Sequence, residues 1–202
     1  MKSVIYILIV LGLQMLLFSG CKNVGLEENE MTKKELVEIT IDDEVINSND
    51  VFRIIEPLWW NVSIYDGEEQ YFRDLQPFTD SQRYVFAIIW YLSEVNNGGH
   101  DQFYFNSTGI VWEDAMKGFE VIGLKKNYEI IKESTMRLGG YPSKDRIERN
   151  NQLEKLEPEF DDLDDRLYKL EKDIDEELLE YIKNNREEFY FKGDVEKPSD
   201  FD

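Results

Sequence analysis

Polar side chains that could bind a ligand or cap a helix are concentrated at positions 94–106, which read E-V-N-N-G-G-H-D-Q-F-Y-F-N. Side-chain amides and a carboxylate surround a Gly-Gly pair, and such groups can cap the free backbone groups at a helix end. We favour this capping role, because polar side chains in turns mostly satisfy backbone groups. The alternative is a small-ligand-binding or weakly hydrolytic pocket. Either role would use the motif residues Glu94, Asn97, Gly98, Gly99, Gln102, Phe103 and Asn106.

The side chains needed for the common catalytic and metal-binding chemistries are scarce. His100 is the only histidine and Cys21 the only cysteine. A nucleophile with a histidine base would have to use His100, and no nucleophile elbow is present. A zinc ion needs several nitrogen or sulfur ligands. We therefore interpret His100 as a turn residue on a solvent-exposed loop, and we predict no catalytic residues, no metal site, no cofactor and no enzymatic activity.

Carboxylates are the second prominent group, and the formal net charge is −20. Residues 154–202 contain 19 acidic and 8 basic residues, a net of −11. Such a charge repels nucleic acid, so we predict no direct nucleic-acid binding and instead a partner with a basic protein surface. The acidic runs lack the spacing of a calcium-binding loop and are typical of a solvated helix face. The predicted acidic partner face comprises Asp161, Asp162, Asp164, Asp165, Asp173, Glu176 and Glu177.

The motif at 94–106 also carries a family resemblance. A Glu-Val-x-Asn-Gly-Gly-x-x-Gln-Phe-x-x-Asn core is matched throughout, and Arg149, Leu163-Asp164 and Tyr181-Ile182 fit later positions. Roughly residues 50–190 thereby resemble a bacterial domain family named after a DNA-mimicking inhibitor. The resemblance implies an all-helical domain and, for the namesake, exposed carboxylates that imitate DNA phosphates and occupy a DNA-binding protein. Most such domains have no assigned function.

The N-terminus has the order of an export signal. Lys2 is followed by an apolar stretch over residues 4–18 and then by Phe18-Ser19-Gly20-Cys21, which resembles the bacterial lipobox. The apolar stretch is short for a membrane span. We expect residues 1–20 to be a signal peptide and Cys21 to carry the lipid that anchors the protein in the cell envelope. Lys22, in place of the aspartate that commonly retains lipoproteins, favours the outer membrane over the inner. The alternatives are an uncleaved anchor or, without a signal, a cytoplasmic DNA mimic.

The elements that position these residues are predicted to be helices. Apolar residues recur at three- and four-residue spacing, which predicts an all-α single bundle of about six or seven helices. The expected segments are 51–62 with a break at Pro57, 79–97, 110–122, 124–138, 142–156 and one long amphipathic helix over 163–182. Thr79 and Gln82 form a capping box, and Asn97-Gly98-Gly99 is expected to end that helix.

The remaining segments are predicted to lie outside the bundle. Residues 36–41 could form one short strand or arm, but no convincing partner strand follows. We therefore assign residues 21–47 to a polar tether, 48–191 to the helical domain and 192–202 to a frayed acidic tail. The leading functional hypothesis is a lipid-anchored, acidic protein-binding module.

Overall fold

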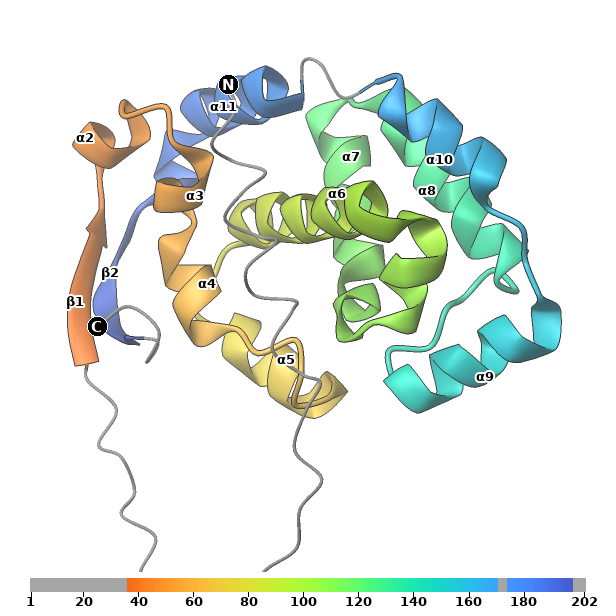
Figure 1. Ribbon diagram of the computed structural model, residues 1–202. Coiled ribbons are helices and arrows are strands. Elements are labelled where there is room, and N and C mark those ends of the chain that lie inside the picture. Colours follow the sequence, from red (N-terminus) through yellow and green to blue (C-terminus); the bar gives the residue numbers. More distant parts are fainter. Residues whose placement is uncertain (1–35, 171–173, 198–202) are drawn as a thin grey trace, which may run out of the picture. The chain divides into compact units, whose positions relative to one another are not determined.

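The computed structural model describes residues 36–170 and 174–197, and this part of the chain is mostly helical (Figure 1). The described residues form ten α-helices, two 3-10 helices and one two-stranded sheet, so the all-α class is confirmed in outline while six or seven helices is too few. Cys21 and Asp173 lie outside the described residues. In chain order the elements are β1 (Leu36–Ile41), α2 (Asp43–Ile46), α3 (Val51–Ile54), α4 (Glu56–Asn61), α5 (Glu68–Leu75), α6 (Asp80–Phe105), η1 (Ser107–Val111), α7 (Trp112–Ile122), α8 (Lys125–Arg137), α9 (Arg146–Leu156), α10 (Asp161–Tyr168), α11 (Ile174–Asn184), η3 (Arg186–Phe189) and β2 (Phe191–Glu196).

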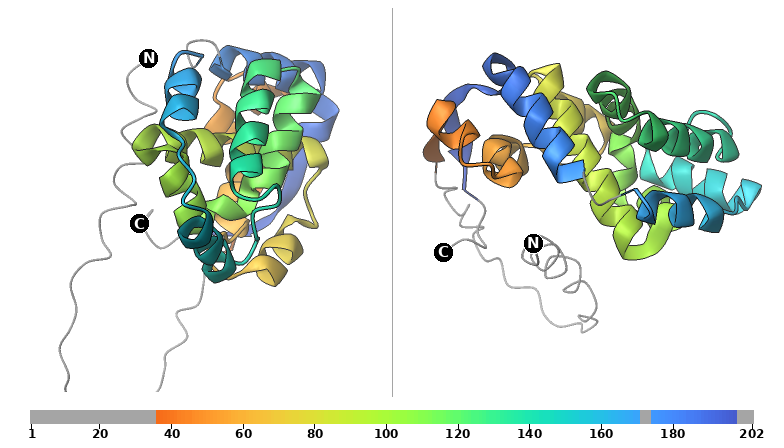
Figure 2. Two further views of the ribbon diagram at one scale, coloured as in Figure 1. Left: turned by 90° about the vertical axis from the view of Figure 1, so that its right-hand side faces the viewer. Right: turned by 90° about the horizontal axis from the view of Figure 1, so that it is seen from above.

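Helix α6 is the central element around which the others pack (Figures 1 and 2). The predicted capping box starts it: the Thr79 hydroxyl accepts from the Gln82 amide at 3.2 Å, and the Gln82 side chain accepts from the Thr79 amide at 3.0 Å. Its buried face contacts α7, α9, α10, α4 and η1. The position of α6 explains why its sequence is apolar on most sides, since a helix surrounded by neighbours has little solvated surface.

Helix α6 does not end at the Gly-Gly pair as predicted. The backbone leaves helical geometry at Gly98 (φ −161°, ψ 27°) and Gly99 (φ 75°, ψ −179°), and the helix then resumes through Phe105. The motif is therefore a kink between two helical halves. Local residue preferences indicate the interruption, but whether the chain leaves or re-enters a helix depends on what packs against it.

The first described strand has a partner, contrary to the prediction. β1 pairs with β2 in antiparallel register from Leu36↔Glu196 to Ile41↔Phe191, so the predicted tether and tail both contribute to the folded part. Ile39, Ile41 and Val195 are buried on the inner face of this ribbon. The last pair is 150 residues apart (191 − 41), and no local pattern shows such a pairing.

The long helix predicted over residues 163–182 is two helices. α10 packs on α6 and α8, whereas α11 packs on α3 and α7. Figure 1 shows α10 and α11 as two separate helices. Both have a buried stripe of leucine and isoleucine at the same spacing, comprising Leu163, Leu167, Ile174, Leu178 and Ile182. The apolar repeat thus continues in sequence although the two stripes face different neighbours.

Candidate functional site

Side chains approach both glycines of the motif closely. A Cβ on Gly98 would lie 2.2 Å from Gln102 Oε1, and a Cβ on Gly99 would lie 2.3 Å from Asp164 Oδ2. Gly99 also has a positive φ with extended ψ, a region that is essentially restricted to glycine. The requirement for glycine is therefore strongest at Gly99, where backbone conformation and close contact coincide.

Helix α10 supplies hydrogen-bond partners on both sides of the kink. An interrupted helix needs new acceptors for the amides after the break and new donors for the carbonyls before it. Asp164 Oδ1 accepts from the His100 amide at 3.0 Å, and the Tyr168 hydroxyl donates to the Val95 carbonyl at 2.9 Å. Asp164 and Tyr168 are four residues apart on one helix face, so α10 holds the kink from a single side. Tyr168 was not anticipated from the sequence.

His100 is buried, contrary to the prediction of an exposed turn histidine. Its Nδ1 is hydrogen-bonded to the Asp164 carboxylate, and its Nε2 lies 2.7 Å from the Tyr91 hydroxyl. Burial raises the pKa of Tyr91 well above its ordinary value, which keeps that hydroxyl protonated. This chain of polar groups lies inside the protein, where it secures the kink.

The amide side chains of the motif bind a carboxylate of the motif instead of capping backbone groups. Gln102 Nε2 donates to Glu94 Oε2 at 2.8 Å, and Asn106 Nδ2 donates to the same oxygen at 3.1 Å. Glu94 precedes the kink and the two amides follow it, so the cluster joins both halves of α6. All three residues are half-buried, Phe103 is buried and Asn97 is exposed.

Arg149 on α9 closes the C-terminal end of α6. It is fully buried and donates to four backbone carbonyls: Tyr104 at 2.7 Å, Asn106 at 2.6 Å, Ser143 at 2.7 Å and Lys144 at 3.1 Å. Burial lowers the pKa of Arg149 to about 10, so the guanidinium is still protonated at neutral pH. From the sequence this arginine stood out only through the family resemblance, since one arginine in a charged helix has no local mark of burial.

Not all carboxylates of the predicted acidic partner face are free toward solvent. Asp164 turns inward to His100, with 15% of its side chain exposed, and is therefore no part of a solvent-facing surface. Asp162 accepts from Arg137 of α8 at 2.8 Å, and this hydrogen bond lowers the pKa of Asp162. Asp161 and Asp165 on α10 are exposed, as are Glu176 and Glu177 on α11. The exposed carboxylates of the predicted face thus come from two helices that pack on different neighbours.

The structure assembles a different acidic surface, here called the acidic end. Arg186 forms an ion pair with Asp43, and the Tyr190 hydroxyl donates to Asp43 at 2.9 Å, which brings η3 and α2 together. Helix α11, which directly precedes η3, contacts α3 and α7 (Figure 1). Lys183 and Arg186 are basic residues of these elements. The exposed carboxylates of the acidic end are Asp42, Asp43, Glu44, Asp175, Glu176, Glu177, Glu180, Glu187 and Glu188.

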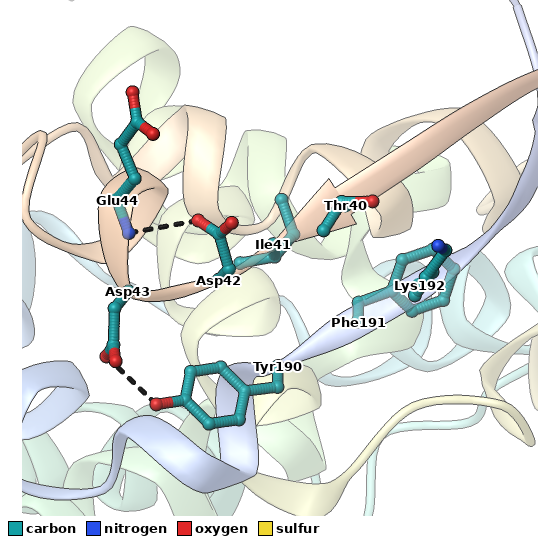
Figure 3. A pocket seen from close by; sticks show the side chains of 8 residues that line it. All are labelled: Thr40, Ile41, Asp42, Asp43, Glu44, Tyr190, Phe191 and Lys192. Carbon is teal, nitrogen blue, oxygen red and sulfur yellow. Dashed lines mark hydrogen bonds between the residues drawn. The ribbon is translucent and has the colours of Figure 1, made fainter.

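A wide, open pocket of about 650 Å³ lies beside this end, where β1 passes into α2 (Figure 3). Asp42 caps α2 by accepting from the Glu44 amide at 2.9 Å. Asp43 is engaged with Tyr190 and Arg186, which lower its pKa. The lining residues are Thr40, Ile41, Asp42, Asp43, Glu44, Tyr190, Phe191 and Lys192. The pocket thus combines carboxylates, aromatic rings and one lysine.

Within residues 36–170 and 174–197, no group of three or more His, Cys, Asp or Glu side chains is arranged to hold a metal ion. No helix among these described residues has both the length and the apolarity needed to span a bilayer.

The comparisons with known proteins give one match. A family model described as DMP19-like protein matches residues 76–185, which contain the motif, Arg149 and Asp164. No curated protein and no solved structure matches the chain significantly.

Proposed function

The chain belongs to the DMP19-like protein family, whose model covers 110 of its 202 residues (76–185), and from this premise we propose that it is a protein-binding module with an acidic recognition surface. The family motif itself is engaged in internal contacts around the kink. Recognition is therefore assigned to surface residues, and the motif residues are assigned to holding the fold.

The acidic end is the observation that carries this proposal. Nine exposed carboxylates come from α2 and its N-cap and from the consecutive elements α11 and η3, and the Arg186–Asp43 ion pair joins η3 to the distant α2. A concentrated negative surface raises the encounter rate with a positively charged partner and disfavours neutral or acidic ones. The partner class is accordingly a basic protein surface, as for a protein that occupies DNA-binding proteins.

Neutralising the acidic end is expected to weaken capture of a basic partner about tenfold or more and to flatten its salt dependence, because each carboxylate adds to the attraction. The variant combines Asp175→Asn, Glu176→Gln, Glu177→Gln and Glu180→Gln, all exposed on α11. The measurement is affinity capture from cell-envelope extract with the purified full chain at two salt concentrations.

A matched control removes the same charge elsewhere through Glu68→Gln, Glu129→Gln, Glu154→Gln and Asp165→Asn, which are exposed outside the acidic end. This control should bind within about twofold of the unaltered chain, because distant exposed charges are screened. Equal losses in both variants would assign binding to net charge and overturn the acidic end as the recognition surface.

We further propose that the protein is exported and lipid-anchored through Cys21, on the support of the signal-like residues 1–21. Labelled palmitate should be incorporated into the unaltered chain and into the control Ser19→Ala, and incorporation should be lost in Cys21→Ala, since the thiol is the acylated group. Absence of label from the unaltered chain would contradict anchoring and favour the cytoplasmic DNA mimic.

The alternative of a small-ligand-binding or weakly hydrolytic loop has less support. The amides of Gln102 and Asn106 are both directed at Glu94, so the polar groups that would face a ligand already satisfy one another. The wide pocket lies at the other end of the fold, beside β1 and β2.

A further inference from the structure

Strand β1 has an outer edge without a strand beside it. The sheet consists of β1 and β2 alone in the described part of the chain, and β2 is the strand that packs on α4. In an antiparallel pair, every second residue of a strand directs its amide and carbonyl away from its partner. The outer edge of β1 therefore presents a row of backbone donors and acceptors, which is a template for another strand.

The strand lacks a proline, a glycine and a bulge, three features that interrupt such an edge. Its sequence L-V-E-I-T-I contains no proline or glycine, and its register with β2 is continuous over six residues, without a bulge. Ile39 and Ile41 are buried on the inner face, so the strand is held firmly against the core. The outer face carries Leu36, which is 63% exposed, together with Glu38 and Thr40. This strand is both accessible and fixed in place.

Charge on the ribbon identifies the kind of strand that would fit. Glu38 stands directly opposite Asp194, and like charges in that position destabilise a strand pair. Lys192 Nζ lies 3.7 Å from Glu38 Oε1, and both side chains are exposed. Beyond the end of β1 follow the carboxylates of Asp42, Asp43 and Glu44, and the open pocket lies beside them (Figure 3).

We propose that the outer edge of β1 binds an extended, basic segment of the partner protein by strand addition. Backbone hydrogen bonds to β1 hold the segment, its basic side chains meet Glu38 and the α2 carboxylates, and the pocket receives a side chain at its end. This inference rests on the proposed function, because it specifies how the basic partner is held.

A second copy of the chain fits the edge poorly. Antiparallel pairing of two β1 strands with Glu38 opposite Glu38 would bring two carboxylates together on the outer face. Such juxtaposition of like charges is unfavourable. A basic segment would instead place positive side chains beside Glu38. Charge therefore favours a basic segment over a second copy of the chain.

The test follows backbone amide exchange of the full chain with and without a blocked peptide of alternating lysine and valine. The bound peptide should slow exchange at those β1 amides that face away from β2. Two control peptides should give no protection: one of alternating glutamate and valine, and one with N-methyl groups on two consecutive central residues, which blocks both strand edges.

Glu38→Lys should lower the affinity of the chain for the lysine-containing peptide about fivefold, the order of one exposed cross-strand charge pair. Glu129→Lys should leave this affinity unchanged.

The outcomes separate this inference from the proposed function. Slow exchange of the outward β1 amides in the free chain would show that the edge is already covered, and the inference would be wrong. Protection of α11 without β1, or equal protection by the N-methylated peptide, would also overturn strand addition while leaving the acidic end as a binding surface. Protection of β1 together with unchanged partner capture by the neutralised acidic end would support strand addition and contradict the acidic end.

Discussion

Replacing Arg149 by methionine is expected to lower the free energy of unfolding by about 3–5 kcal/mol, the largest single-residue effect that we predict. Methionine fills similar space but donates no hydrogen bonds, so the carbonyls of Tyr104, Asn106, Ser143 and Lys144 lose their shared donor. Each buried acceptor left without a partner costs on the order of 1–3 kcal/mol, and partial access of water limits the sum. Urea denaturation followed by circular dichroism measures the difference.

Arg146 provides the matched control on the same helix. It is exposed and donates one hydrogen bond, to the Phe105 carbonyl at 3.0 Å, so Arg146→Met should cost less than about 1 kcal/mol. Arg149→Lys should fall between the two, because an ammonium has three donors at a single nitrogen and cannot serve all four carbonyls. A loss below about 1 kcal/mol for Arg149→Met would show that these carbonyls are satisfied without the guanidinium.

Replacing Gly99 by alanine is the second change with a large expected effect, a loss of about 3 kcal/mol or more. The alanine would keep a backbone conformation reserved for glycine (φ 75°, ψ −179°), and its Cβ would lie 2.3 Å from the Asp164 carboxylate. The carboxylate would have to move, and its bonds to the His100 amide and ring would be lost. Thermal and urea unfolding measure the loss.

Gly67 separates the two contributions. It has nearly the same backbone conformation (φ 86°, ψ 174°), but nothing lies within 4 Å of a Cβ built there. Gly67→Ala should therefore cost only the backbone strain, about 1–3 kcal/mol. In a double-mutant cycle, Gly99→Ala with Asp164→Ala should be less destabilising than the sum of the single changes, because the clash is absent. Additive losses would contradict the close contact.

Several elements were predictable because their ends are encoded locally. The capping box at Thr79 and Gln82 starts α6, and Gly123 ends α7 with a left-handed φ of 89°. Pro57 lies in the first turn of α4, at the break that it predicts. Such signals involve residues within one turn of each other, and they act whatever the rest of the chain does.

Other predictions were wrong where the deciding contact is distant in sequence. Nothing near Leu36 shows that it pairs with Glu196, and the similar apolar stripes of α10 and α11 look like one helix until their neighbours are known. His100 was placed on an exposed loop because it follows two glycines. It is buried because Asp164, 64 residues later, accepts its amide. A residue's neighbours along the chain do not determine its neighbours in space.

By itself the sequence determined the helical class, the strongly acidic charge and the motif by which the family is recognised, because these follow from composition and short-range pattern. Only the tertiary structure decided what each charged residue does. It turned Asp164 inward to hold the kink, buried Arg149 beneath the end of α6, and brought η3 against α2 through the Arg186–Asp43 ion pair. A carboxylate in an acidic run is available to a partner only where packing leaves it exposed, and packing is set by contacts between distant segments.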